Sequence, residues 1–463
     1  MNKNRNRKMV IVLVVLIALL LFIALYLAYF HLFKAKFYAN HNMNARNWVD
    51  ENKIARGTIK DRDGNILTYS QKTKDGQSVR VNNYKYIYSP IIGYTSTQFG
   101  KTGIEQSFNR ELLDLPSGDD FVSQLEDLYK KSDKGRDLFL TIDSEVQSFM
   151  YGLLKGYSGA IVVLEPKTGD VISMVSRPTF NINKLEENWE ELINSNEAVL
   201  LNRATQGLYI PGSTFKVLSS IAYLKKGVDL DYDDKGTTVI DGYKIANYNE
   251  KANGKIGLKE ALMNSANTYY ADKSTELQNG DFLSVTDSFM LGKKYDFDIT
   301  RSFSKIVYSN KIDKLEKAAS AFGQGKNLVT PLDMANVAAA IANDGKMMKP
   351  RLVYKTEKKG KVRDIETQLL SDALDKTTND TMVEYMTETA SHNGFSLENG
   401  MKLAGKSGTA ETGPDTTDLW YIGFGPSDNP KYAVAIVLEN TGTQNGHIAG
   451  RKFVQAMQFL LDR

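Results

Sequence analysis

The 463-residue sequence contains no cysteine, ten prolines and only four histidines. Without cysteine the chain can form neither a disulfide scaffold nor a metal site built on thiolates. Ten prolines are too few for a proline-rich linker protein. The histidines show none of the spacings of a zinc site, so we do not expect a zinc enzyme. They are His31, His41, His392 and His447.

The chain also has little net charge, because 58 Lys and Arg residues against 55 Asp and Glu residues give +3. Four basic residues lie before residue 9, and subtracting these four from +3 leaves −1 for the rest of the chain. Since nucleic-acid-binding proteins carry a basic surface, no nucleic acid is expected as a partner. Hydrophobic residues make up 42% and charged residues 24%, which excludes a disordered or collagen-like chain. The length allows two or three domains.

An N-terminal run without charged residues predicts a membrane anchor. Residues 9–30 carry no charged and no strongly polar side chain, and as a helix they cover about 30 Å, enough to span a bilayer. A core helix rarely stays apolar on every face over this length. A signal-peptide core is usually about 7–15 residues, and no small-x-small cleavage site follows. The basic residues before the run predict that residues 1–8 stay in the cytoplasm and that the rest of the chain lies outside.

The rest of the chain predicts a small mixed region followed by one sheet with helices on its faces. Asp63-Gly64-Asn65 has the composition of a hairpin turn. Residues 71–137 are expected to mix short helices and loops, and the chain should be largely helical after Pro211. Strands at both ends of the second part predict one sheet closed by C-terminal strands. The predicted strands are 159–165, 171–176, 403–409, 419–425 and 432–439, and the clearest predicted helices are 330–345 and about 450–461.

With histidine scarce, the best candidate for nucleophilic chemistry is a serine activated by a lysine. Pro211-Gly212 forms a turn before Ser213-x-x-Lys216, and residues 215–223 continue as an apolar helix. Ser213 therefore lies at a helix start, with Lys216 one turn later on the same face. A neutral lysine can take the proton of a hydroxyl, which is a weak nucleophile on its own. The backbone N–H groups of a helix start favour an oxyanion.

The Ser-x-x-Lys motif becomes specific only when Ser-x-Asn and Lys-[Ser/Thr]-Gly follow it in that order. Ser265-Ala-Asn267 and Lys406-Ser-Gly408 complete such a set with Ser213, and Lys406 lies in the predicted strand 403–409. A rival ordered set starts at Ser302, but it lacks the Pro-Gly turn, and its Ser391 lies only 15 residues before Lys406. The competing matches are Ser302-Phe-Ser-Lys305, Ser391-His-Asn393, Ser427-Asp-Asn429, Lys101-Thr-Gly103 and Lys167-Thr-Gly169.

With these motifs the sequence resembles the class B penicillin-binding proteins, which are membrane-anchored peptidoglycan D,D-transpeptidases, and most of all their smaller PbpA-like members. The resemblance implies an α/β (α+β) fold: a transpeptidase domain of the serine β-lactamase type at 145–463, with an antiparallel sheet flanked by helices. A smaller mixed pedestal (dimerisation-type) domain at 35–144 would precede it. Further landmarks of the family are 56–67, Gly103-Ile-Glu105 with Phe108, 140–143 with Gln147, 159–180, and Gly323-Gln-Gly325 with Thr330-Pro331.

The resemblance also implies a role for each motif residue and no cofactor. Ser213 would attack the carbonyl of D-Ala-D-Ala, and Lys216 would take its proton. Ser265 would relay a proton to the leaving group, while Asn267 would hold the substrate amide. Lys406 would keep the site positive, which favours a neutral Lys216 and attracts the terminal carboxylate. The substrate-binding strand would be Ser407, Gly408 and Thr409, and the backbone N–H groups of Ser213 and Thr409 would form the oxyanion hole.

Three other functions use parts of this pattern. A class A β-lactamase needs a deacylating Glu between the second and third motifs, yet the nearest look-alike, Glu190-Glu-Leu-Ile-Asn194, precedes Ser213 and fits a helix surface better. A sensor related to the β-lactamases is an alternative of the same kind. Residues 30–144 have no role in such an enzyme. A D,D-carboxypeptidase, which gives the acyl group to water, stays open, although the N-terminal domain favours a transpeptidase. An intact set of motifs argues against a non-catalytic scaffold.

The expected partners follow from the same resemblance. They are peptidoglycan stem peptides ending in D-Ala-D-Ala, β-lactams, the cell membrane, and a membrane-embedded SEDS-type (RodA/FtsW-like) glycosyltransferase that the pedestal would dock on and stimulate. A domain held near the bilayer by a short linker has a high effective concentration for such a partner. Arg56, Asp61 and Arg62 lie in the pedestal, and the alternative is that they form structural salt bridges.

Overall fold

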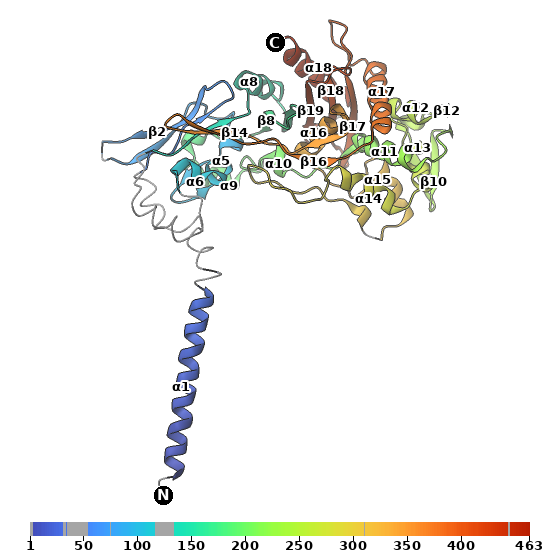
Figure 1. Ribbon diagram of the computed structural model, residues 1–463. Coiled ribbons are helices and arrows are strands. Elements are labelled where there is room, and N and C mark those ends of the chain that lie inside the picture. Colours follow the sequence, from blue (N-terminus) through green and yellow to red (C-terminus); the bar gives the residue numbers. More distant parts are fainter. Residues whose placement is uncertain are drawn as a thin grey trace.

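A computed structural model describes residues 3–30, 34, 54–74, 76–115, 134–309, 311–442 and 445–463. His31, His41 and the predicted pedestal residues 35–53 and 116–133 lie outside these ranges. The N-terminal helix α1 (Lys3–Tyr29) stands apart from the rest of the molecule (Figure 1). Within the candidate span Arg7–Tyr29, an 18-residue window has a mean hydropathy of 3.4 and is not buried in the protein, so α1 is long and apolar enough to cross a membrane.

The pedestal is built on a six-stranded sheet with the order β15-β14-β6-β1-β2-β3. The predicted turn at Asp63-Gly64-Asn65 joins β1 and β2, which pair antiparallel. The strand β3 was not predicted, because residues 71–137 show no long alternation of apolar and polar residues. The strands are β1 (Ile59–Lys60), β2 (Ile66–Lys72), β3 (Ser78–Asn82), β6 (Asp137–Leu140), β14 (Val353–Lys358) and β15 (Lys361–Asp364). Smaller elements are α4 (Ser89–Ile92), β4 (Thr95–Ser96), β5 (Gly100–Lys101), α5 (Gly103–Ser107) and α6 (Asn109–Leu113).

Two strands of this sheet come from more than 200 residues further along the chain. The strand β14 pairs antiparallel with β6, and β15 extends the sheet by one strand. The pedestal sheet therefore contains a segment from within the predicted range 145–463. Backbone hydrogen bonds between β6 and β14 thus join the two halves of the chain.

Two of the three charged residues named for the pedestal, Arg56 and Asp61, are engaged inside it, whereas Arg62 is exposed. Arg56 Nε and Arg80 Nε contact the two carboxylate oxygens of the buried Glu105 at 2.8 and 2.6 Å. Burial would raise the pKa of Glu105, but Arg80 and Arg56 together lower it. Asp61 accepts hydrogen bonds from the backbone N–H groups of Asp63 and Asn65. Arg56 and Asp61 therefore make structural interactions.

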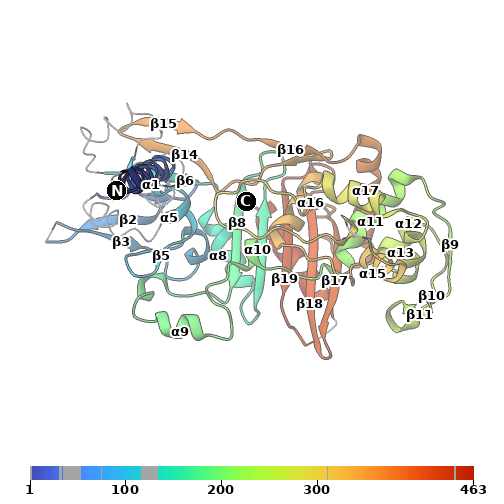
Figure 2. The same cartoon turned by 90° about the horizontal axis from the view of Figure 1, so that it is seen from below.

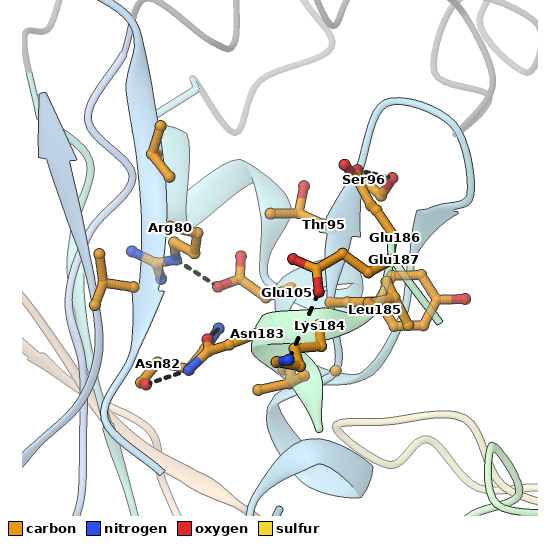
Figure 3. A pocket seen from close by; sticks show the side chains of 15 residues that line it. Arg80, Asn82, Thr95, Ser96, Glu105, Asn183, Lys184, Leu185, Glu186 and Glu187 are labelled. Carbon is orange, nitrogen blue, oxygen red and sulfur yellow. Dashed lines mark hydrogen bonds and ion pairs between the residues drawn. The ribbon is translucent and has the colours of Figure 1, made fainter. Parts of the chain in front are cut away.

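Polar side chains of the pedestal face the segment that follows β8 (Val171–Arg177). A cavity of about 520 Å³ lies between the two. Figure 3 shows its lining side chains, with the Arg80–Glu105 pair on one wall. Residues 182–187, which begin with the short helix η2 (Ile182–Lys184), form the opposite wall of the cavity. Asn82 Nδ2 donates to Asn183 Oδ1 at 3.1 Å, and Asn183 Nδ2 donates to the Asn82 carbonyl at 3.0 Å. These bonds couple the pedestal to the second domain.

The second domain contains a five-stranded antiparallel sheet with the order β17-β18-β19-β7-β8. The C-terminal strand β19 pairs with the early strand β7, which confirms the predicted closure of the sheet by C-terminal strands. In Figure 2 the sheet runs from β8 beside the pedestal to β17 beside the helices α11 (Lys216–Lys226), α12 (Leu258–Met263) and α13 (Asn267–Ser274). The strands not yet given are β7 (Gly159–Leu164), β17 (Ala404–Gly413), β18 (Thr416–Gly425) and β19 (Tyr432–Leu438).

Alternate side chains of this sheet enter two separate cores. Residues such as Ile161 and Val163 pack with the helices α8 (Ser144–Leu153) and α18 (His447–Leu461). Their neighbours Ala160 and Val162 face the helical side, where α16 (Pro331–Ala342) crosses the sheet. Both faces are therefore covered, which explains why β7 and β19 are almost continuously apolar. The helix predicted at 330–345 is confirmed: the Thr330 side chain accepts from Asp333 N, and Pro331 is the first residue of α16.

The prediction that the chain is largely helical after Pro211 is incomplete. Three two-stranded sheets lie among the helices: β9 (Tyr232–Asp234) with β12 (Gly254–Ile256), β10 (Thr237–Ile240) with β11 (Tyr243–Ala246), and β13 (Lys346–Met348) with β16 (Leu369–Asp372). Strands of three or four residues are too short to show a period of two. The helices are α9 (Trp189–Asn194), α10 (Arg203–Gln206), α11 (Lys216–Lys226), α12 (Leu258–Met263), α13 (Asn267–Ser274), α14 (Asn279–Ser288), α15 (Lys314–Ala321) and α17 (Lys376–His392), with the 3-10 helices η3 (Gly212–Phe215), η4 (Tyr248–Glu250) and η5 (Val307–Ser309).

Candidate active site

The Ser213 segment lies against β17. It forms the 3-10 helix η3, and α11 follows directly from Lys216. Gly212 has a φ of 54°, and a Cβ there would lie 2.7 Å from the Thr409 carbonyl oxygen. Only glycine tolerates both the left-handed backbone and this close approach. Pro211-Gly212 therefore lets the backbone beside Ser213 touch the strand that carries Lys406.

Lys216 is the centre of the site, because its buried Nζ contacts three motif residues. Nζ lies 3.1 Å from Ser213 Oγ, 2.7 Å from Asn267 Oδ1, and 2.7 and 3.1 Å from the carbonyl oxygen and Oγ of Ser265. Burial, together with the charge of Lys406, lowers the pKa of Lys216 well below its usual value. The arrangement therefore favours a neutral amine next to a serine hydroxyl.

Ser265 and Asn267 lie at the junction of α12 and α13. Ser265 has a φ of 53°, an uncommon conformation for serine. This backbone turns both its carbonyl and its hydroxyl towards Lys216. Asn267 begins α13, and its Nδ2 donates to the Ala246 carbonyl at 3.0 Å while its Oδ1 contacts Lys216. In this structure the Asn267 amide thus links Lys216 to β11.

Lys406 reaches the same group of residues from β17. Its Nζ lies 3.2 Å from Ser265 Oγ and 2.9 Å from the Ser407 carbonyl oxygen. Burial lowers the pKa of Lys406 to about 7. Ser265 Oγ therefore lies between Lys216 and Lys406. Lys216 is also held by the backbone carbonyl oxygen of Ser265 and the side-chain carbonyl oxygen of Asn267. All three predicted motifs meet at this point.

An open cavity of about 780 Å³ lies over the motif residues. Ser213, Ser265, Asn267 and the strand residues Ser407, Gly408 and Thr409 line it. Most of the other residues that line the cavity were not predicted from the sequence, because they belong to no spaced motif. Gln324 lies within the Gly-Gln-Gly landmark and Asn393 within a competing Ser-x-Asn, so only these two carried a signal. The additional lining residues are Ala246, Asn247, Tyr248, Asn249, Asn264, Phe322, Gln324, Asn393, Glu411, Asn445, Gly446 and His447.

The competing match Ser391-His-Asn393 lies at the end of α17, with Asn393 in the cavity wall, whereas the other competing matches make structural contacts elsewhere. Ser302 Oγ donates to the Gln206 carbonyl, and Ser304 Oγ bonds Asp333. Lys167-Thr-Gly169 forms the turn between β7 and β8, where Thr168 bonds Glu165. Ser427-Asp-Asn429 lies in the turn between β18 and β19, and Lys101 belongs to β5. The structure therefore brings together the set Ser213, Lys216, Ser265, Asn267 and Lys406.

Two further sequence expectations concern other chemistry. Glu190 to Asn194 lie in α9, which has no buried residue, so the look-alike of a deacylating Glu is a surface helix as expected. Within the described part of the chain, no three His, Asp or Glu side chains are placed to hold a metal ion.

Comparisons with known proteins agree with this geometry. A family model described as "Penicillin binding protein transpeptidase domain" matches residues 159–458, and one described as "Penicillin binding protein A dimerisation domain" matches residues 56–137. The chain is 29% identical over 435 residues to the peptidoglycan D,D-transpeptidase PbpA of Mycolicibacterium smegmatis, which covers 86% of this chain and 87% of that protein.

Two solved structures share the fold over nearly their full length. Penicillin-binding protein A from M. tuberculosis, as an imipenem acyl-enzyme complex, matches with a TM-score of 0.81 and 26% identity over 89% of this chain and 99% of that chain. The D,D-transpeptidase domain of a peptidoglycan glycosyltransferase from Eggerthella lenta matches with a TM-score of 0.79 and 29% identity over the same shares.

Proposed function

Because the chain belongs to the class B penicillin-binding proteins, we propose that it cross-links peptidoglycan by passing the stem-peptide acyl group through Ser213. It is a membrane-anchored peptidoglycan D,D-transpeptidase of the serine type that binds β-lactams. In the proposed reaction Ser213 Oγ attacks the penultimate D-Ala carbonyl, and the terminal D-Ala leaves with a proton on its nitrogen. An amine of a second stem peptide then attacks the ester and restores the hydroxyl.

The hydrogen bonds of Lys216 are the observation that carries this proposal. A neutral amine has two N–H donors and one lone pair. The carbonyl oxygens of Ser265 and Asn267, both at 2.7 Å, can only accept, so they take the two N–H groups. The lone pair then faces the two hydroxyls at 3.1 Å, of Ser213 and Ser265. Lys216 is thus arranged to take a proton from a hydroxyl, as a general base must.

The other motif residues complete the reaction. Ser265 Oγ, between Lys216 and Lys406, passes the proton to the leaving nitrogen. Lys406, where it is charged, attracts the terminal carboxylate of the substrate, and Ser407 and Thr409 hydrogen-bond that carboxylate. The backbone N–H groups of Ser213 and Thr409 stabilise the oxyanion. This stabilisation is expected to lower the activation barrier more than any other single interaction.

Covalent reaction with benzylpenicillin tests the proposed site. Intact-protein mass spectrometry should find one adduct per chain, and peptide mapping should locate it on Ser213. A β-lactamase would release the adduct and consume the drug. A scaffold would form none. A carboxypeptidase would form the adduct but would hydrolyse stem peptides without producing cross-linked dimers, so the same preparation should be given strands with pentapeptide stems.

We also propose the orientation of the anchor. The basic residues Lys3 to Lys8 precede the apolar part of α1, so the N-terminus should stay in the cytoplasm and the catalytic domain outside. Protease added to intact protoplasts should then degrade the large domain while a cytoplasmic control protein survives. Protection of the large domain while an externally exposed control protein is cut would contradict this orientation.

The pedestal is the proposed docking site for a SEDS-type glycosyltransferase, whose glycan polymerisation it would stimulate. Since Arg56, Glu105 and Asp61 are engaged within the pedestal, they are poor candidates for the docking surface. The hairpin of β2 and β3 instead exposes apolar side chains, with Ile66 45% and Val79 49% exposed. The strand β3 is also the edge of its sheet. An exposed apolar edge supports contact with a partner.

Charged substitutions on this hairpin test the docking proposal. Ile66→Glu and Val79→Glu should lower co-purification with the polymerase and the formation of glycan strands from lipid II, while penicillin labelling stays normal. Val239→Glu is the matched control, since Val239 is 64% exposed on β10, in the second domain. If every variant that loses polymerisation also loses penicillin labelling, or if Val239→Glu has the same effect, the pedestal acts only as support.

A further inference from the structure

A buried carboxylate with only neutral partners lies next to α13. Asp234, the last residue of β9, is 1% exposed. Its Oδ1 accepts hydrogen bonds from Gly236 N at 2.9 Å and from Thr268 Oγ1 at 2.8 Å. Asn247 Nδ2 donates to both carboxylate oxygens, at 3.0 and 2.8 Å, and Asn253 Nδ2 donates to Oδ2. No ion pair with a described residue therefore compensates the burial of this charge.

The charge of Asp234 fixes which way the Asn247 amide points. Burial would raise the pKa of Asp234, but hydrogen bonds from the Gly236 N–H and the side-chain donors lower it, so the group is an anion that only accepts. The other N–H of Asn247 donates to the Lys251 carbonyl oxygen at 3.0 Å, which also only accepts. The Oδ1 end of Asn247 must therefore face the opposite way, where it accepts from Thr268 N at 3.1 Å.

Asn247 thereby caps α13 from outside the helix. The residue before the helix is Ala266, whose side chain cannot accept a hydrogen bond, and the first helical residue is Asn267. The N–H groups of a first helical turn need acceptors from elsewhere. Asn247 Oδ1 supplies one to Thr268, the second residue of α13. The start of α13 is therefore held by a side chain that Asp234 orients.

The residue before Asn247 completes the link to Lys216. Ala246 ends β11, and its carbonyl oxygen accepts from Asn267 Nδ2 at 3.0 Å. Because this carbonyl cannot donate, the Asn267 amide must turn its Oδ1 the other way, to Lys216 Nζ at 2.7 Å. Two adjacent residues therefore hold the first turn of α13, one by its side chain and one by its backbone. A shift of this pair would move the oxygen that aligns the Lys216 amine.

We propose that Asp234 is a positioning residue for the active site: through Asn247, its carboxylate fixes the orientation of Asn267. This inference rests on the proposed function, in which Asn267 accepts from Lys216 and holds the substrate amide. Asp234 does not line the cavity, so it reaches the ligand only through these residues. Asp234→Asn should break the link, because its new N–H group would face donors and draw Asn247 Oδ1 away from Thr268.

Two β-lactams that differ in the side-chain amide test the inference with the full-length enzyme. Benzylpenicillin carries this amide, and 6-aminopenicillanic acid has the same nucleus with a free amine instead. Asp234→Asn should slow acylation by benzylpenicillin on the order of 10- to 100-fold, as for a misplaced active-site group. The acylation rate ratio, benzylpenicillin over 6-aminopenicillanic acid, should also fall about two- to tenfold, the range of one lost hydrogen bond. Partial unfolding would slow both reactions equally and leave this ratio unchanged.

Matched variants assign the fall in the ratio to the proposed link. Asn267→Ala should lower the ratio by a similar factor, and Asn247→Ala should do so while Asp234 keeps its other donors. Asp272→Asn is the control, because Asp272 also ties a small sheet to α13, by accepting from Thr238 Oγ1 at 2.9 Å, but lies late in the helix. It should leave the ratio unchanged.

Each result decides for or against the link. An equal loss with both β-lactams in Asp234→Asn, an unchanged ratio in Asn267→Ala, or the same fall in Asp272→Asn overturns the inference. If Asp234→Asn does not fold, the ratio in Asn247→Ala decides. These outcomes leave the proposed function standing, whereas a wild type that neither β-lactam acylates overturns the proposed function as well.

Discussion

Replacement of Ser213 by alanine is expected to abolish both the penicillin adduct and cross-linked peptidoglycan. Ser213 Oγ lies 3.1 Å from the Lys216 amine, and its segment η3 packs against β17 beside Thr409. Removing a nucleophile that acts through a covalent intermediate lowers the rate by roughly 10⁴-fold or more. The penicillin adduct measured by mass spectrometry should fall to background, and so should the amount of muropeptide dimers.

Two serines of this chain serve as controls for that experiment. Ser265 Oγ is as close to Lys216 as Ser213 Oγ is, at 3.1 Å, and it could in principle react. Ser265→Ala should nevertheless keep an adduct on Ser213, formed slowly, because the proton relay is lost. Ser302→Ala alters the second Ser-x-x-Lys match and should label normally, since Ser302 bonds the Gln206 carbonyl. An adduct on Ser265 in the Ser213→Ala variant would reassign the nucleophile.

Replacement of Lys216 by arginine is expected to slow acylation by several orders of magnitude. Arginine keeps the positive charge but does not give up its proton in proteins, so it cannot act as the base. Stopped-flow acylation by a β-lactam measures the effect. Lys226→Arg is the control, because Lys226 lies on the same helix, is exposed, and pairs with Asp281 in a way that arginine can also do. Near-normal acylation by Lys216→Arg would refute the role of Lys216.

The pH dependence gives a second measurement of the same role. Burial and Lys406 lower the pKa of Lys216, so its neutral form persists to lower pH than that of an ordinary lysine and is lost as the pH falls through the lowered pKa. Burial lowers the pKa of Lys406 to about 7, so its charge is lost as the pH rises through this value. Acylation should therefore fall at acidic pH in the wild type, and Lys216→Arg should lack this acidic limb.

Features set by short stretches of chain could be predicted from the sequence. The spacing of Ser213 and Lys216 places them one helical turn apart, and Pro211-Gly212 marks the entry to that turn. The cap at Thr330, the hairpin turn after β1 and the strands β7 and β8 follow from residues only a few positions apart. The apolar run of α1 depends on composition alone. Backbone geometry couples neighbours within about four residues, so such patterns are visible without the fold.

Features made by distant segments needed the structure. The strands β14 and β15 join the pedestal sheet although more than 200 residues separate β14 from β6, and no local pattern indicates that pairing. The three small sheets after Pro211 were missed because their strands are shorter than the pattern that identifies a strand.

The active site combines both kinds of information. The sequence by itself determined which residues we propose for the chemistry, because the order and spacing of three motifs select Ser213, Ser265 and Lys406 among several matches. Only the tertiary structure decided how they meet: Lys216 Nζ contacts two carbonyl oxygens and the hydroxyls of Ser213 and Ser265, and an open cavity lies over these residues. Burial and the nearby Lys406 charge lower the pKa of Lys216, and both arise only when α11, α13 and β17 pack together.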